Sequence, residues 1–512
     1  MSSNSSTIVQ EIRQEFESIL NYVGNAHDEI ADGVERQLFK RLLGMGQQLM
    51  QLFFVIRGAE SSRTSAGDAN GNELPHYGER KRDYFSIFGK VSCERPYFYQ
   101  TGIGGTTPLD AELSLGTDCY SDLMREMLEY VGVDVPYEKA QGLFTHILGQ
   151  SVSKNAIQSM VAEDSQDVEA YYEQKAPPKS EEEGQILTVQ VDGKGVPMVR
   201  ETLAPAKVRL GKGDKRTKKK ESIVTAIYTI ESNPRSPKDV VASIFHKDEQ
   251  LANRKEKGAP AQPQNKQVWA TLAGKDTALE RLVKQVTLRN GSHIQHRLAL
   301  TDGAEALQTR VLAYLPDFTL ILDFIHANEY LWKAGNCLFS EKDPKRLVWV
   351  EERTLQILSG QTEQLILELR TLAQAPDTNK TQQEQLDNTA NYFARNLAYM
   401  DYSLYLANGW PIASGVIEGA CRHVVKDRFE LSGMRWTQAG AESLLHLRSV
   451  AINGDWDAYH QFRQRQRHQR LYHLPFPQKP ISEDLALTSF SAQPVNLFCF
   501  SSAQSSPDAL AA

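Results

Sequence analysis

Three acidic residues lie where the sequence could gather carboxylates around divalent metal ions. Asp192 follows the apolar run "QILTVQV", Asp302 follows "RLALT", and Glu418 lies within "SGVIEGACRHVVKDR". Carboxylate oxygens are ligands that Mg²⁺ prefers, and Mg²⁺ keeps coordination positions for water and phosphate. Two such ions about 3.5–4 Å apart can activate the attacking oxygen and stabilise the leaving oxygen of a phosphodiester displacement. The three residues are therefore candidate metal ligands and candidate catalytic acids.

Each acid also has an ordinary structural explanation. Asp302 stands three residues before Glu305, a spacing typical of a helix cap. Asp192, which precedes Gly-Lys-Gly, fits a turn, and Glu418 has the spacing for an ion pair with Arg422 on one helix face. Residue types and spacing alone leave these alternatives open.

The elements that would position the acids follow a mixed α/β pattern. Runs typical of strands cover residues 185–193, 222–230, 240–245, 297–303 and 318–323, with helical patterns between the last three. In open α/β sheets, function gathers at the carboxyl ends of the strands. We therefore expect Asp192, Asp302 and Asp323 to end three strands at one edge. Because glycine lacks a Cβ, Gly193 and Gly303 would let substrate backbone approach the first two acids.

Residues before the sheet predict a different region. Residues 6–57 have helical spacing of apolar residues, and residues 58–82 read as a linker. Residues 83–100 carry two aromatic, β-prone runs that indicate a hairpin around Gly89-Lys90. Residues 137–163 predict two helices, the first ending near Gly149 and the second capped by Ser153. This layout is that of a helix-turn-helix, although the segment taken alone favours an ordinary helical hairpin.

The remaining segments complete the predicted organisation. Residues 340–408 switch to helical patterning, and a helix is expected over 438–452. The predicted parts are an N-terminal helical region (1–60), a hairpin and helix-turn-helix-like region (83–175), a mixed α/β core (185–339 and 409–452), a helical insertion (340–408), a basic helix (453–473) and a disordered tail (474–512).

Composition bounds the class of protein. The 512 residues are 41% hydrophobic, contain no membrane-length apolar run and carry a net charge of −7. The five cysteines show neither a CxxC pair nor a disulfide framework, which predicts a reducing, cytoplasmic location. Net charge disfavours nucleic-acid binding weakly, but basic runs cover 207–220 and 462–470. Candidate DNA contacts in the first run are Lys215, Arg216, Lys218, Lys219 and Lys220.

The order strand-Asp, strand-Asp, helix-Glu resembles the DDE transposases, whose core is RNase H-like. "DFIH" (323–326) resembles the Asp/Cys-x-x-His element of the Mutator-like superfamily and of related bacterial insertion-sequence transposases. "TDGAEAL" and "SGVIEGACRHVVKDRFELSGMRWT" resemble further blocks of these transposases, and the similarity covers about residues 185–450. The resemblance implies that Asp192, Asp302 and Glu418 are the catalytic acids, with Asp323 and His326 as an auxiliary pair.

The resemblance also implies a fold and an activity. The expected fold is α/β, a mixed RNase H-like sheet with an all-α insertion, preceded by N-terminal helices, a β-hairpin and a helix-turn-helix-like segment. The expected activity is Mg²⁺-dependent cleavage of DNA at terminal inverted repeats and strand transfer into target DNA, with Mn²⁺ able to substitute and at least a dimer on DNA. Arg422 and Lys426 would contact phosphates. Glu329 and Glu430 are the competing acids. The alternatives are an inactive DNA-binding protein and an RNase H-like nuclease without strand transfer.

Overall fold

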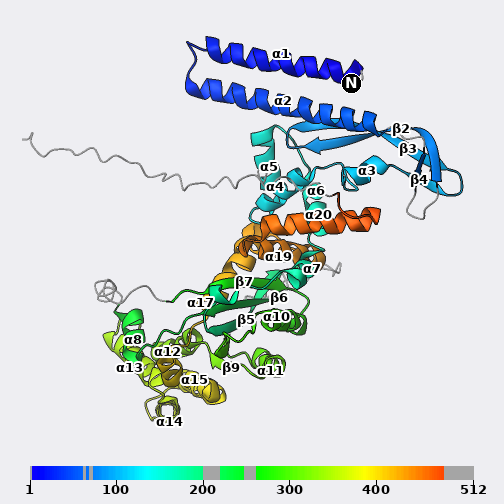
Figure 1. Ribbon diagram of the computed structural model, residues 1–512. Coiled ribbons are helices and arrows are strands. Elements are labelled where there is room, and N and C mark those ends of the chain that lie inside the picture. The colour runs from blue at the N-terminus through cyan, green and yellow to red at the C-terminus, as the bar shows by residue number, and fades with distance from the viewer. Residues whose placement is uncertain (1–2, 62–64, 68–72, 200–218, 247–260, 478–512) are drawn as a thin grey trace, which may run out of the picture.

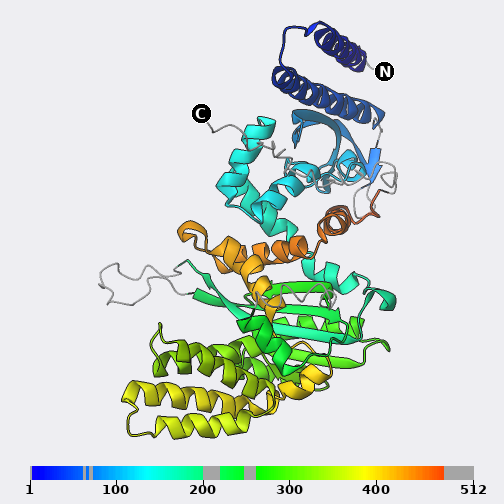
Figure 2. The ribbon, with the colours of Figure 1, turned by 90° about the vertical axis from the view of Figure 1, so that its left-hand side faces the viewer.

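The computed structural model describes residues 3–61, 65–67, 73–199, 219–246 and 261–477. The molecule is elongated, with a two-helix hairpin at one end, a mixed sheet in the lower half and a bundle of helices at the other end (Figures 1 and 2). No helix in these ranges combines the length and the apolar character needed to cross a membrane.

The N-terminal helices lead into an antiparallel sheet. Helices α1 (Ser3–Asn25) and α2 (Ala31–Glu60) precede strands β1 (Ser65–Gly67), β2 (Glu73–Ser86), β3 (Gly89–Gln100) and β4 (Gly104–Thr106), which pair in that order. The predicted hairpin is confirmed, with Ser86 opposite Gly89. The predicted linker 58–82 is wrong in its second half, because β2 begins at Glu73. Most of β2 faces solvent, so its polar sequence conceals the strand.

The predicted helix pair is confirmed in both position and capping. It consists of α5 (Tyr137–Leu148) and α6 (Lys154–Asp164), next to α3 (Pro108–Glu112), α4 (Asp122–Gly132) and α7 (Val168–Gln174). Gly149 ends α5 in the left-handed conformation, at φ +67°, where glycine has no steric penalty. The Ser153 hydroxyl accepts a hydrogen bond from the backbone N–H of Ala156 at 3.2 Å, which caps α6.

The central sheet has five strands in the order β7-β6-β5-β8-β9. They are β5 (Ile186–Pro197), β6 (Lys219–Ile230), β7 (Gln264–Thr271), β8 (His296–Thr301) and β9 (Thr319–Leu322). The first three strands form an antiparallel meander, and β8 and β9 then add in parallel to β5. This order and these directions are those of an RNase H-like core, so the predicted fold class is confirmed.

One predicted strand is wrong. Residues 240–245 belong to helix α8 (Pro237–Phe245), and the third strand of the meander is β7. Ser236 and Asp239 form a reciprocal capping box at the start of α8, and Pro237 occupies its first turn. These helix-start signals outweigh the β propensity of the Val-Val pair that follows.

Helices cover both faces of the sheet. After α10 (Lys275–Arg289) and α11 (Glu305–Tyr314) come α12 (Phe324–Leu338), α13 (Pro344–Leu358), α14 (Thr362–Ala373), α15 (Lys380–Asn396), α16 (Tyr402–Ala407), α17 (Gly415–Ala420), a π-helical turn (Cys421–Lys426), α18 (Asp427–Phe429), α19 (Gln438–Ile452) and α20 (Trp456–Tyr472). Leu298 and Ile321 of the sheet share one core with Phe393 of the helical insertion. The insertion is therefore packed on the sheet.

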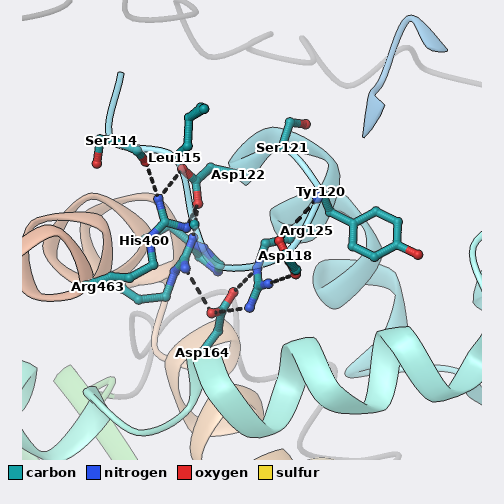
Figure 3. Close-up of polar contacts among 12 residues, drawn as sticks. Ser114, Leu115, Asp118, Tyr120, Ser121, Asp122, Arg125, Asp164, His460 and Arg463 are labelled. Carbon is teal, nitrogen blue, oxygen red and sulfur yellow. Dashed lines mark hydrogen bonds and ion pairs between the residues drawn. The ribbon is translucent and has the colours of Figure 1, made fainter. Parts of the chain in front are cut away.

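The basic helix α20 buries two of its arginines, whereas Arg465 and Arg470 are exposed. Arg463 and Arg467 are buried, and both pair with Asp122. Arg463 also contacts Asp164 at 2.8 Å, and Arg125 of α4 contacts Asp164 from the other side at 2.6 Å (Figure 3). The interpretation of residues 462–470 as a cationic surface is therefore wrong for Arg463 and Arg467, because acids from α4 and α6 neutralise them.

Candidate active site

The acids predicted at strand ends gather near one edge of the central sheet. Asp302 follows β8 directly and Asp323 follows β9, and these two strands are parallel neighbours. Asp192 lies two residues beyond the last parallel pair between β5 and β8, Gln190 opposite Leu300. The prediction that the strand ends at Asp192 is wrong, because β5 continues past the sheet edge while paired with β6.

The Asp192 carboxylate is held by weak donors and faces another acid. Its Oδ1 accepts from the backbone N–H of Gly193 at 2.6 Å, and its Oδ2 accepts from the Cys421 thiol at 3.3 Å. Burial raises the pKa of Asp192 above its usual value, and the Asp302 charge raises it further, against the lowering effect of these hydrogen bonds. Asp192 and Asp302 are therefore electrostatic neighbours whose ionised forms repel each other.

The helical insertion fixes the turn that carries Asp302. The Tyr392 hydroxyl of α15 donates to the backbone oxygen of Asp302 at 2.9 Å, and Arg395 donates to the oxygen of Gly303 at 2.6 Å. Gly303 has φ +86°, and a Cβ there would lie 2.8 Å from the Tyr392 hydroxyl oxygen. The space that we expected substrate to enter at Gly303 is thus filled by Tyr392. The Asp302 carboxylate accepts from the N–H of Ala304 at 2.9 Å.

Asp323 uses its carboxylate to join three parts of the site. It caps α12 by accepting from the N–H groups of Ile325 at 3.2 Å and His326 at 3.3 Å. It also accepts from the N–H of Ser414 at 2.9 Å, and its Oδ2 lies 2.5 Å from Nδ1 of His326. A carboxylate offers about four acceptor sites. Four donors therefore saturate the buried Asp323.

Asp323, His326 and Glu418 can each place one ligand atom within 4.8 Å of the others, a separation that suits a metal ion. Since Asp323 is saturated, we assign it to positioning: it commits Nδ1 of His326, so a ligand would be met by Nε2. The hydrogen bond with Asp323 raises the pKa of His326 to about 9. Glu418 is exposed and lies near the Ser414 hydroxyl, at 3.5 Å. This closest group contains neither Asp192 nor Asp302.

A buried glutamine ties the helix of Glu418 to the central strand. Oε1 of Gln190 accepts from the backbone N–H of Ile417 at 2.8 Å, and its Nε2 donates to the Tyr228 hydroxyl at 3.0 Å. Gln190 therefore connects β5, which carries Asp192, to the residue before Glu418. Sequence reasoning missed this residue. The available signal was a polar side chain inside the apolar run "ILTVQV", because a buried polar group requires partners.

The small residues around Glu418 do not act as expected. A Cβ on Gly415 or on Gly419 would have no heavy atom within 4 Å, so neither glycine provides close approach. The helix packs instead through Ile417, Ala420 and Cys421, which are buried. The chain then widens into a π turn over 421–426, a feature that recurs at functional sites.

The predicted cationic residues differ in their surroundings. Arg422 and Lys426 are exposed, and Arg422 lies 3.6 Å from Asp427. Lys219 pairs with Glu430, which lowers the pKa of that competing acid. Lys220 lies beside it at the start of β6. Lys215, Arg216 and Lys218 lie outside the described residues.

Comparison with known proteins leaves the family undecided. No protein-family description matches the sequence, and no curated protein sequence matches it. Among solved structures, a Drosophila P element transposase strand transfer complex aligns with 70% of this chain and 83% of its own, at 9% identity and a TM-score of 0.23. At this TM-score, no residue role and no activity is carried over from that structure.

Proposed function

We propose that this protein is a metal-dependent DNA transposase that binds the terminal inverted repeats of an insertion sequence, cleaves a strand and transfers it to target DNA. The observation that supports this most is that Asp192 and Asp302 are electrostatic neighbours at the edge of an RNase H-like sheet, while Glu418 lies close to Asp323 and His326. Divalent cations would relieve the repulsion between these acids and assist phosphodiester chemistry.

The donor set fits Mg²⁺ or Mn²⁺. Asp192, Asp302 and Glu418 offer carboxylate oxygens, which hard cations prefer, and burial together with the Asp302 charge raises the pKa of Asp192. Bound ions would supply activation of the attacking oxygen and stabilisation of the leaving oxygen. We propose these three residues as the metal ligands, with His326 Nε2 as a further group on the same side.

Other residues of the chain orient these groups. Gln190 holds the helix of Glu418, Tyr392 holds the turn of Asp302, and Asp323 holds the imidazole of His326. With its pKa raised to about 9, His326 is protonated at neutral pH in the metal-free protein and would donate a hydrogen bond to a phosphate oxygen. Arg422 and Lys426, both exposed, would contact neighbouring phosphates.

We assign recognition of the DNA ends to the α5–α6 pair. Ile157, Met160 and Val161 pack α6 against the protein, whereas its first turn exposes Lys154 and Asn155. A second helix that buries one face and exposes its N-terminal residues has the layout needed to enter a major groove. The exposed side chains Gln158 and Ser159 continue that surface.

The test is Asp302→Asn, assayed on a plasmid that carries the reading frame with its flanking DNA. Metal-dependent strand cleavage should fall to background while DNA binding persists, because the amide keeps the shape of the side chain and removes its charge. Asp317→Asn is the matched control, since Asp317 is exposed in the loop before β9. Cleavage at the wild-type rate by Asp302→Asn would refute the proposal.

A second assay separates strand transfer from simple hydrolysis. Pre-cleaved element ends, with free 3′-hydroxyls, are incubated with the wild-type protein, Mn²⁺ and target plasmid. Covalently joined product is expected. Hydrolysis without joining would instead assign the chain to nucleases of the same fold, and failure of both reactions would favour a DNA-binding protein without catalysis.

A further inference from the structure

The N-terminal hairpin leaves an unusual amount of apolar side chain in solvent. Across the 30 residues of α2, all of them described, Phe54 is the one that is buried. Yet the sequence of α2 is rich in Leu, Met and Phe over "LFKRLLGMGQQLMQLFFVI". A helix that is apolar on most sides is normally covered by other protein.

The exposed apolar residues form one stripe on each helix. The stripe on α1 and the stripe on α2 recur at helical spacing, and every member is 42–51% exposed. The members are Phe16, Leu20 and Val23 on α1 and Phe39, Leu42, Leu49 and Phe53 on α2.

The two stripes lie on the same face of the hairpin. Arg41 pairs with Glu15 at 2.7 Å and Tyr22 bonds to Glu29 at 2.6 Å, so the helices are antiparallel. Successive residues are about 100° apart around a helix. Seen from the N-terminus of its own helix, each stripe therefore lies roughly a quarter turn clockwise from the side that faces the other helix. Because the helices run in opposite directions, this equal rotation turns both stripes to one side.

Only part of the hairpin surface is covered by other elements. The second half of α2 packs on β3, where the Gln47 side chain donates to the oxygen of Lys90 at 2.7 Å and Gln51 donates to that of Ser92 at 2.9 Å. Helix α1 packs on α2 alone among the elements with extensive contacts. The face that carries both stripes is thus the exposed apolar side of the hairpin.

We propose that this apolar face binds the same face of a second copy of the chain, forming a four-helix bundle about a two-fold axis. Seven side chains that each expose about half of roughly 150 Å² give about 500 Å² per subunit, or about 1,000 Å² for the pair, which meets the lower limit for a specific interface. A two-fold axis matches each patch to itself, so a single surface suffices.

The composition of the face favours a second copy over DNA. All seven side chains are uncharged, whereas a phosphate backbone requires cations. Each stripe continues at helical spacing into an exposed charge of the opposite sign from the other: Arg13 lies three residues before Phe16 on α1, and Glu35 lies four residues before Phe39 on α2. The hairpin also lies at the far end of the molecule from the central sheet (Figure 1), so the acids of both copies stay accessible.

The test is the mass of the full-length protein in solution by sedimentation equilibrium, without DNA or metal. Wild type should have twice the 57.5 kDa mass of one chain. Leu20→Glu/Leu42→Glu should raise the dissociation constant at least about a hundredfold, because each charge enters an apolar interface. Leu367→Glu, on exposed α14, is the matched control and should leave the dimer intact.

Two results would overturn the proposal: a wild-type protein that stays monomeric, and a dimer that persists unchanged in the double variant. The glutamate variant could lose the dimer because it misfolds, so Leu20→Ala/Leu42→Ala is measured as well. The alanine variant should weaken the dimer by a smaller factor and keep the circular dichroism spectrum of the wild type. Because this readout needs neither metal nor DNA, it can fail without affecting the proposed catalytic role of Asp302, and the reverse also holds.

Discussion

Asp164 and Asp192 are two largely buried aspartates with opposite electrostatics. Burial alone would raise the pKa of Asp164, but the guanidiniums of Arg463 and Arg125 outweigh it and hold the pKa at about 2 (Figure 3). Burial raises the pKa of Asp192, and its nearby donors, the Gly193 N–H and the Cys421 thiol, are too weak to reverse that shift. The first acid is neutralised within the protein, and the second is not.

This difference separates a structural cluster from a candidate site. Around Asp164 of α6, Arg125 of α4 and Arg463 of α20 join these three helices. Around Asp192, the Asp302 charge raises the pKa further and the His326 charge lowers it, and His326 is itself engaged by Asp323. Acids near one another at a sheet edge repel each other when ionised, and a divalent cation would relieve that repulsion.

The largest expected effect is on the cluster of Asp164, Arg125 and Arg463, called the matched cluster because the arginines neutralise the acid. Arg125→Met should lower the free energy of unfolding by about 3–5 kcal/mol, because it leaves Asp164 buried with one counter-charge fewer. Arg125 is almost fully buried and bonds to Asp164 at 2.6 and 3.0 Å. Urea unfolding at pH 7 measures the change, with Arg435→Met, at an exposed position, as the control.

The same variant has a defined pH dependence. The pKa of Asp164 is depressed, so its contribution is present above the unfolded value near pH 4 and is lost as the pH falls toward 2. The stability difference between wild type and Arg125→Met should therefore narrow between pH 4 and pH 2. A difference that stays constant over this range would show that Asp164 is not the acid that Arg125 stabilises.

A smaller effect is expected where β5 meets the helix that carries Glu418. Gln190→Leu leaves the N–H of Ile417 and the hydroxyl of Tyr228 without their partner, which should cost about 1–3 kcal/mol of stability. Displacement of Glu418 should lower the cleavage rate by a further tenfold to hundredfold, on the order expected for a misplaced catalytic group.

Gln185→Leu, at the residue before β5, controls for the loss of a polar side chain close to the same strand. If Gln190→Leu loses stability but cleaves at the wild-type rate, Gln190 is structural and does not position Glu418. The cleavage assay, normalised to the folded fraction, distinguishes the two outcomes.

Local patterns predicted the strands that carry the acids better than they predicted the contacts. Asp302 and Asp323 were found because an apolar run followed by Asp marks a strand end. The inward turn of Arg463 was not predictable, since its partner Asp122 lies 341 residues away in sequence. Gln190 and Ile417 are likewise 227 residues apart. Burial of a charge depends on such distant partners, which residue spacing does not contain.

Helix and strand ends failed where capping and pairing compete with propensity. The Val-Val pair of α8 looked like a strand because its capping box lies before the apolar run. Strand β5 extends past Asp192 because its antiparallel pairing with β6 continues after its pairing with β8 stops. The sequence of β5 alone does not show that its pairing with β8 ends before its pairing with β6.

The smallest expected effect tests the proposed metal ligands Asp192, Asp302 and Glu418, called the unmatched cluster, directly. Wild type should unfold at a higher temperature when Mn²⁺ is added, by an amount equivalent to about 1.4 kcal/mol at tenfold excess over the dissociation constant. Asp192→Asn should abolish most of this gain, because it removes one charged ligand. Without metal the variant should be at least as stable as wild type, since an acid with a raised pKa is replaced by a neutral amide.

The comparison with Asp164 then becomes quantitative. Removing a counter-charge from the matched cluster destabilises the protein without metal, whereas removing an acid from the unmatched cluster does so only with metal present. Asp317→Asn should keep the full Mn²⁺ response. An Asp192→Asn protein that loses stability without Mn²⁺ and still responds to Mn²⁺ would mean that Asp192 is a structural residue, as Asp164 is, and that the metal is held by other acids.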